Sequence, residues 1–186
     1  APGMGVDRLA PRVRDTAIRF WRLYLGLTVL IAVGFLVAGM GPFDAVAHAL
    51  TTASTGGFST RDASIGHWDS IAVESVLIVA LILAAASFTL HSRSWSRKRI
   101  THFADHEFRG FLSVLAICTL VVSTLLALDG MAPGRALRIG LFNVVTLGTS
   151  GGFGNATGAG SDGDFVRWAA GPQRILLFLL VFGGCT

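Results

Sequence analysis

Charged residues and cysteines are scarce in this sequence of 186 residues. Only 14% of the residues are charged, whereas soluble domains average about 25%, and this shortage argues against an ordinary soluble domain. The two cysteines, Cys118 and Cys185, match neither a disulfide framework nor a zinc-binding pattern. The sequence contains no P-loop lysine, no G-x-S-x-G turn and no H-E-x-x-H pair. We therefore expect no enzyme and no bound cofactor.

Long apolar runs account for much of the remaining sequence, which is 52% hydrophobic. Residues 23–40, 75–92 and 110–128 contain no Lys, Arg, Asp or Glu, and each run has 18 or 19 residues. A helix needs about 20 apolar residues to cross the bilayer core. A fourth apolar run begins at Ile175 and reaches the last residue. The sequence therefore predicts an all-α integral membrane protein surrounded by membrane lipids. Since it does not start with Met, we expect it to be an internal part of a longer protein.

The distribution of charge predicts the orientation in the membrane. The segment before the first run and the link between the second and third runs hold ten basic residues against four acidic ones. The basic residues are Arg8, Arg12, Arg14, Arg19, Arg22, Arg93, Arg97, Lys98, Arg99 and Arg109. Basic segments stay in the cytoplasm, so both regions are expected there. Stacking aromatics do not accompany these residues, which argues against a nucleic-acid partner.

A short motif occurs twice, 95 positions apart. Residues 53–60 read ASTGGFST and residues 148–155 read GTSGGFGN. Each copy follows a short apolar segment that starts at a proline, Pro42 or Pro133, and proline is favoured at the first position of a helix. The first of these segments has about 12 residues, or roughly 18 Å of helix, which is about half a bilayer. The pattern predicts two units, each made of a span, a pore helix, a filter loop and a second span.

The loops have the composition expected for a cation path. A dehydrated potassium ion is stabilised by rings of backbone carbonyls, and glycine adopts the backbone conformations that such a lining needs. The C-terminal end of each short helix adds a partial negative charge beside the ion. We expect K⁺ at the carbonyls of both loops, with Thr55, Gly56, Gly57, Ser150, Gly151 and Gly152 as the ion-binding residues. Phe58 and Phe153 should support the loops by pointing outward and wedging them against their surroundings.

Polar side chains near the loops allow more than one interpretation. Asp44, Asp62, Asp69 and Glu74 lie on the expected outer side, where carboxylates can attract cations, although such residues are common on any surface. His48 precedes the first loop and is expected to be a hydrogen-bonded residue of the pore helix rather than a pH-sensitive group.

The residues of these segments resemble the Trk/Ktr/HKT superfamily of potassium transporters, in particular its TrkH-type membrane subunit. Residues 43–70, FDAVAHALTTASTGGFSTRDASIGHWDS, resemble the pore region of the second repeat of that family. Residues 142–153, FNVVTLGTSGGF, resemble the filter of the third repeat, and residues 105–109, DHEFR, resemble the start of its outer helix. The resemblance implies a pseudo-fourfold cation channel built from four span–pore-helix–filter loop–span units.

The resemblance assigns parts of the chain to particular repeats. Residues 1–91 would be a second-type repeat, residues 92–107 a basic cytoplasmic linker, and residues 108–186 a third-type repeat truncated in its inner helix. Gly57 and Gly152 would be the selectivity glycines, and Gly183 and Gly184 would begin an intramembrane gate. The implied function is gated potassium uptake across the cytoplasmic membrane, with the filter loops facing outside.

The resemblance also implies partners, and it leaves alternatives open. It implies a homodimer and a cytoplasmic ring of nucleotide-binding, TrkA-type regulatory subunits. A sodium-permeable relative of the same family is the first alternative. The second is a membrane scaffold whose glycines only allow close helix packing. The second unit departs from the family pattern at Gly154 and Asn155, and the return that follows them is rich in glycine.

Overall fold

A computed structural model describes residues 9–86, 90–91 and 105–183, and every regular element in these ranges is a helix. The longer helices are α1 (Leu9–Val37), α2 (Pro42–Ala53), α3 (Ile71–Ala85), α5 (His106–Leu128), α6 (Pro133–Gly148) and α7 (Ala170–Gly183). Two short 3₁₀ helices, η1 (Ser64–His67) and η3 (Phe165–Arg167), lie in the segments that lead to α3 and α7. The expected all-helical class is confirmed.

Local sequence signals account for the start of most helices. Pro42 and Pro133 occupy the first turns of α2 and α6, where a missing N–H is harmless. The Ser70 side chain accepts a hydrogen bond from the N–H of Val73 at the start of α3. Asp105 accepts bonds from the N–H groups of residues 107 and 108 at the start of α5. Such caps satisfy backbone groups that have no partner within the helix.

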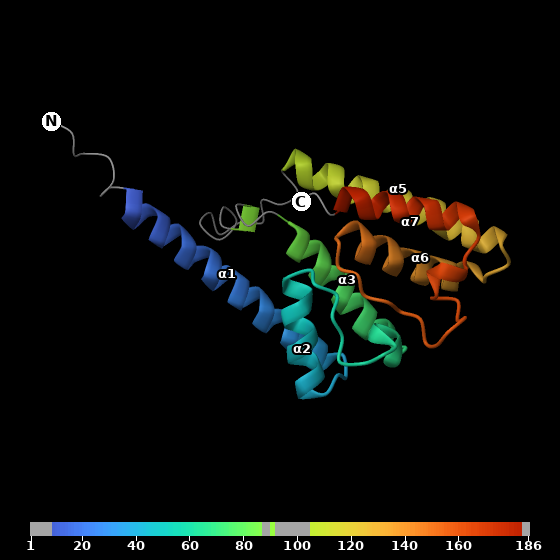
Figure 1. The fold of residues 1–186 in the computed structure, drawn as a ribbon, viewed down its shortest axis with the longest axis horizontal. Coiled ribbons are helices and arrows are strands. Elements are labelled where there is room, and N and C mark those ends of the chain that lie inside the picture. Colours follow the sequence, from blue (N-terminus) through green and yellow to red (C-terminus); the bar gives the residue numbers. More distant parts are fainter. Residues whose placement is uncertain (1–8, 87–89, 92–104, 184–186) are drawn as a thin grey trace.

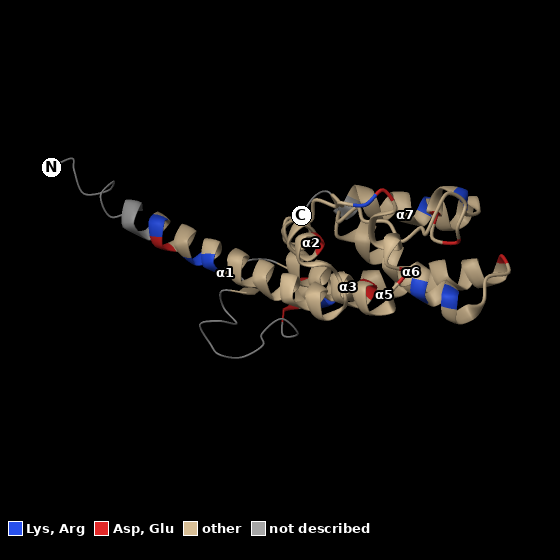
Figure 2. Ribbon diagram, turned by 90° about the horizontal axis from the view of Figure 1, so that it is seen from below, with Lys and Arg blue, Asp and Glu red and all other residues tan. Residues whose placement is uncertain are grey.

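Two of the described helices are long and apolar enough to cross a bilayer. They are the 25-residue segment Val13–Val37 of α1 and the 23-residue helix His106–Leu128. Helix α1 begins at Leu9, 14 residues before the apolar run 23–40, because no helix-breaking residue separates its basic and apolar parts. Figure 2 shows that the charged residues of α1 are confined to its N-terminal half. Helix α3 begins before the expected run and ends at Ala85, while part of the expected run 75–92 lies outside the described residues.

The helices form two groups that meet through α3 (Figure 1). In the first group α1 packs chiefly on α2, and in the second α5 and α7 lie beside α6. Helix α3 contacts α1 and α2 of its own group and also α6 of the other group. Each group has the same order, which is a long helix, a short helix, a glycine loop and a further apolar helix.

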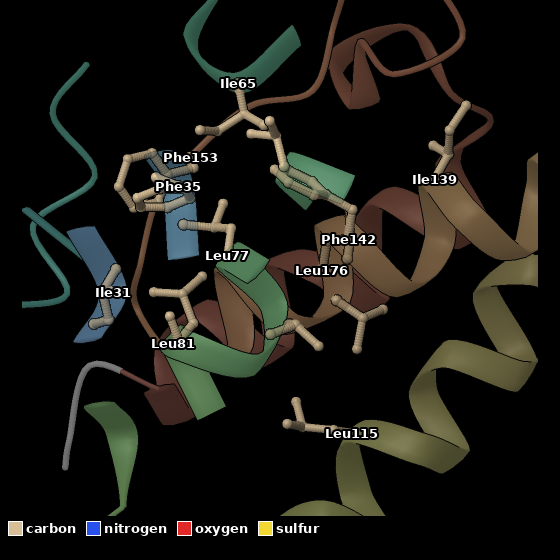
Figure 3. Packing of buried hydrophobic residues seen from close by; sticks show 14 of the residues in the cluster. Ile31, Phe35, Ile65, Leu77, Leu81, Leu115, Ile139, Phe142, Phe153 and Leu176 are labelled. Atoms are coloured by element: carbon tan, nitrogen blue, oxygen red, sulfur yellow. The ribbon is translucent and has the colours of Figure 1, made fainter. Parts of the chain in front are cut away.

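One continuous apolar core joins the two groups. It includes Phe35 of α1, Leu77 of α3, Phe142 of α6 and Leu176 of α7, each at most 1% exposed. Figure 3 shows these side chains meeting around α3. In lipid, close packing and van der Waals contact hold helices together more than water exclusion does. The core therefore positions the two groups through the shape of their contact surfaces.

The outer faces of the two long helices carry many exposed apolar side chains. On α1 these include Val29, Leu30 and Val33, and on α5 they include Ile117 and Leu120, all at least 50% exposed. A soluble monomer rarely exposes so much contiguous apolar surface. These faces have the composition of surfaces covered by lipid or by further helices.

A small residue allows α5 and α6 to approach closely. A β-carbon on Gly140 of α6 would lie 2.5 Å from the Oγ and 3.4 Å from the Cα of Ser123 in α5. A β-carbon on Gly134, in the first turn of α6, would have no atom within 4 Å. Gly148, at the end of α6, also faces α5, since a β-carbon there would lie 2.6 Å from Cδ2 of Leu115. The α5–α6 contact therefore involves Gly140 and Gly148, whereas Gly134 lies outside it.

We expect Gly140→Val to lower the thermal unfolding midpoint of the detergent-solubilised protein, because overpacking a close contact costs about 1–3 kcal/mol. Gly134→Val is the matched control, since it places the same side chain on the same helix in open space. Equal midpoints for the two variants would contradict the close contact between α5 and α6.

Candidate functional site

Both glycine loops begin where a short helix ends. Helix α2 ends at Ala53 and helix α6 ends at Gly148, each at the first residue of the motif. The C-terminal end of a helix carries a partial negative charge of roughly half an elementary charge. Both loops therefore start in a region that favours a cation.

The two loops have the same unusual backbone conformation. Thr55 and Gly57 have positive φ angles of 50° and 70°, and Ser150 and Gly152 have positive φ angles of 57° and 68°. The residues between them, Gly56 and Gly151, are not in the positive range. Successive carbonyls of an ordinary extended strand point to opposite sides. When the sign of φ alternates from one residue to the next, successive carbonyl groups can instead point to the same side of the loop.

The carbonyl oxygens at the centre of each loop are not engaged within the described part of the chain. No hydrogen bond there is accepted by the carbonyls of residues 55–57 or 150–152. Carbonyls on either side of these segments do accept bonds, for example Thr52 from the N–H of Thr55 and Leu147 from the N–H of Ser150. Of these six residues only Gly151 is buried, while Gly56 and Gly152 are exposed. The six carbonyls therefore lie mostly at the surface of the described chain, where they are free to bind a ligand.

The structure brings the two loops into contact at their glycines. A β-carbon on Gly57 would collide with the carbonyl oxygen of Gly151 and would lie 3.1 Å from the Cα of Gly152. A β-carbon on Gly152 would in turn lie 4.0 Å from the Cα of Gly57. The predicted ion-binding residues of the two units are therefore neighbours in space, although 95 positions separate them.

A threonine of the preceding helix holds each loop. The Thr51 hydroxyl donates to the carbonyl of Phe58 (2.9 Å), and the Thr51 carbonyl accepts from the N–H of Gly56 (2.7 Å). The matching Thr146 accepts the N–H of Phe153 on its hydroxyl (2.8 Å) and the N–H of Gly152 on its carbonyl (3.1 Å). Each threonine thus bonds the last turns of its helix to two residues of the loop that follows.

His48 and Asn143 occupy matching positions on α2 and α6, and both are buried. Each side chain makes one hydrogen bond to the backbone of its own helix. His48 Nδ1 bonds the carbonyl of Asp44 (2.7 Å), and Asn143 Nδ2 bonds the carbonyl of residue 139 (3.0 Å). The other bond reaches the segment beyond the loop, at Ser59 (2.9 Å) or Asn155 (3.1 Å). His48 is thus a hydrogen-bonded residue of the short helix, as the sequence predicts.

The segment after the second loop lies along the first unit. The N–H of Gly66 donates to the carbonyl of Gly154 (3.2 Å), and the N–H of Gly154 donates to the Ser64 hydroxyl (3.3 Å). A β-carbon on Gly66 would collide with the backbone of Ala156. Backbone contacts therefore fix the second loop against the return segment of the first unit.

The two loop phenylalanines differ in burial. Phe153 is 2% exposed and belongs to the apolar core shown in Figure 3. Its ring stacks on that of His48, with the ring centres 6.2 Å apart. Phe58 is 77% exposed. The side chain of the second loop thus packs against the first unit, while its counterpart in the first loop is not covered by the described chain.

Three of the four acidic residues expected on the outer side are paired with arginine. Asp44 accepts bonds from Thr60 (2.6 Å) and Arg61 (2.7 Å). These bonds, with that from Thr60 as the larger cause, hold the pKa of Asp44 below its usual value. Asp69 and Glu74 both bind Arg138, at 2.9 and 2.8 Å. Two arginines thus pair with three carboxylates, which leaves one net negative charge at the exposed Asp69.

Several predicted features lie partly or wholly outside the described residues. Gly183 is the last residue of α7, whereas Gly184 and Cys185 are not described. Residues 92–104 of the predicted basic linker are likewise outside the described ranges. Cys118 lies on α5 and is partly buried.

Comparison with known proteins identifies the relatives of this chain. Residues 6–186 match the protein family described as TrkH, a cation transport protein. The Trk system potassium uptake protein TrkH of Halomonas elongata is 40% identical over 183 residues, covering 97% of this chain and 36% of that protein. The corresponding protein of Vibrio parahaemolyticus is 37% identical over 191 residues, covering 100% of this chain and 38% of that protein.

A solved structure has the same fold. The crystal structure of the potassium transporter TrkH from Vibrio parahaemolyticus superposes with a TM-score of 0.80 at 34% sequence identity. The match covers 96% of this chain and 38% of that one. The chain thus spans a little over a third of the length of these relatives.

We expect Gly57→Ala to lower the thermal unfolding midpoint, because the methyl group would collide with the second loop and a positive φ costs a non-glycine residue about 1–3 kcal/mol. Gly56→Ala, next to it but without a positive φ, should change the midpoint much less.

A second control separates strain from collision in the Gly57 variant. Gly130 also has a positive φ, of 98°, but a β-carbon there would meet no atom within 4 Å. An equal loss of stability in Gly57→Ala and Gly130→Ala would argue against contact between the loops.

Proposed function

The chain belongs to the TrkH family of cation transport proteins, and we propose that it supplies two adjacent sides of a selectivity filter for potassium uptake across the cytoplasmic membrane. The observation that carries this proposal is the pair of glycine loops that touch one another while their six central carbonyls remain open. The relatives named above are potassium uptake proteins by name, which supports K⁺ as the transported ion.

The arrangement of the loops suits a weakly bound, dehydrated cation. In the proposal, carbonyls of Thr55, Gly56 and Gly57 and of Ser150, Gly151 and Gly152 replace water around K⁺. Uncharged carbonyls bind an ion without trapping it, as conduction requires. The C-terminal ends of α2 and α6 add a favourable potential at the same place.

Two loops enclose only part of a path, and the unequal burial of the phenylalanines supports a larger ring. Phe153 packs against the unit that precedes its own, next to His48. If Phe58 occupies the same place in a repeating arrangement, a further unit of the same kind would cover it. We therefore assign residues 1–91 to the second repeat and residues 108–186 to the third repeat of a pseudo-fourfold channel.

Orientation and partners follow from the same assignment. The basic N-terminal segment and the 92–107 linker would lie in the cytoplasm, with the loops facing outside. In the intact protein the exposed faces of α1 and α5 would contact lipid, other helices or a second copy in a homodimer. The linker would contact a cytoplasmic TrkA-type regulatory subunit, and Gly183 and Gly184 would begin the gate below the filter.

We expect Gly57→Ser in the intact transporter to lower the ratio of K⁺ to Na⁺ permeation, because the larger residue displaces the carbonyls at the contact between the loops. Uptake of ⁸⁶Rb⁺ and ²²Na⁺ into proteoliposomes measures the ratio. Gly130→Ser is the control, since it has a similar positive φ but lies in open space between α5 and α6.

The alternatives predict other outcomes of the same experiment. An unchanged ratio with impaired assembly would support a scaffold role for the glycines. Equal permeation of K⁺ and Na⁺ by the unmodified protein would indicate a sodium-permeable relative.

The pseudo-fourfold arrangement predicts that Phe58 is buried in the intact protein. In a background without Cys118 and Cys185, Phe58→Cys should react slowly with a membrane-impermeant maleimide. Val166→Cys, at a residue 70% exposed in η3, should react rapidly and serves as the control. Comparable rates at the two positions would contradict a further unit over Phe58.

A further inference from the structure

A buried carboxylate links the two units beside the second loop. Glu74, in the first turn of α3, is only 4% exposed. It accepts bonds from Nε (2.8 Å) and Nη2 (3.3 Å) of Arg138 on α6. Its Oε1 also accepts a bond from Nδ2 of Asn155 (3.3 Å). One side chain of the first unit therefore binds both the short helix and the loop of the second unit.

Asn155 connects this contact to the expected ion path. It lies three residues after Gly152 and is 6% exposed. Its Oδ1 accepts a bond from Asn143 of α6, so its side chain is held from both sides. Glu74 sets the position of Asn155 relative to α3, and Asn143 sets its position relative to α6. The segment that leaves the second loop thus has a fixed place between the two units.

The side-chain contacts around the first loop are local. Ser59 is bound by His48, and Thr60 and Arg61 are bound by Asp44, all within the first unit. In the described residues, Glu74 is the charged side chain of the first unit that reaches the second loop. Glu74 can therefore affect the position of one loop relative to the other, whereas His48 and Asp44 act within the first unit.

Burial makes this contact sensitive to small changes. A buried carboxylate is costly unless it is paired and its remaining oxygen lone pairs are used. Arg138 and Asn155 together satisfy Glu74. Asp69, the other carboxylate on Arg138, has a 67% exposed side chain, and none of its described bonds reaches the loop.

We propose that Glu74 is a positioning residue for ion selection, which sets the spacing between the two groups of loop carbonyls by holding Asn155. This inference rests on the proposed potassium path. It concerns the position of the loop and not the negative charge near it, and the two effects can be separated by experiment.

The test measures the ⁸⁶Rb⁺ to ²²Na⁺ uptake ratio of the intact transporter in proteoliposomes. A ratio does not depend on the amount of protein inserted. Glu74→Gln removes the charge and replaces one of the two carboxylate oxygens that serve Arg138 and Asn155 with an NH₂ donor. Asn155→Asp places a second carboxylate against Glu74. Each should lower the ratio by about threefold or more, as expected for residues coupled in one network.

Combining the two changes should restore the ratio. In the double variant Glu74→Gln/Asn155→Asp, the amide of residue 74 can donate to the carboxylate of residue 155, which also accepts from Asn143. We expect a ratio closer to that of the unmodified protein than to either single variant. A double variant as impaired as the worse single variant would overturn the inference.

Two further variants separate position from charge. Glu74→Asp keeps the charge but shortens the side chain, and it should also lower the ratio. Asp69→Asn removes a charge from Arg138 without altering the loop contact, and it should leave the ratio within about twofold. Equal effects of Asp69→Asn and Glu74→Gln, or no effect of any Glu74 variant, would overturn the inference. Failure of the unmodified protein to favour Rb⁺ over Na⁺ would instead contradict the proposed function.

Discussion

The backbone contact between Gly57 and the Gly151–Gly152 pair is the constraint on which the rest of the structure depends. There is no room for a β-carbon at Gly57, so the two loops can approach this closely only when residue 57 is glycine. The approach also requires that both loops leave their helices at matching levels. Helices α2 and α6 both end at the first residue of the motif, and Thr51 and Thr146 fix how each loop turns.

Apolar and polar contacts have separate roles around this constraint. The apolar core brings α3 between the two groups of helices, but apolar contacts alone tolerate small sliding movements. Directional bonds remove that freedom at particular points, such as Gly66 to Gly154 and Glu74 to Asn155. These bonds all join the first unit to the segment after the second loop. Of the two loops, the second is thus the one that side-chain and backbone bonds tie to the other unit.

Much of the fold could be predicted from sequence because its signals are local. Apolar runs, Pro42 and Pro133, and the repeated motif indicate the helices. The boundaries of α2 and α6 lie within one residue of the ranges expected from the sequence, 43–54 and 133–149. The pairing of Arg138 with Glu74 could not be predicted, because it joins residues 64 positions apart and follows no spacing rule. The unequal burial of Phe58 and Phe153 could not be predicted either, because both follow the same Gly-Gly pair and the sequence gives no sign of their different surroundings.

The hydrogen bonds of the two loops differ while the backbone is the same. The Thr51 hydroxyl donates to a carbonyl, whereas the Thr146 hydroxyl accepts an N–H. His48 in one unit is replaced by Asn143 in the other, yet both brace the segment after the loop. Positive φ angles nevertheless recur at the same two positions of each motif. This is expected if the functional groups are peptide carbonyls, because a function carried by the backbone constrains its conformation and leaves the supporting side chains free to differ.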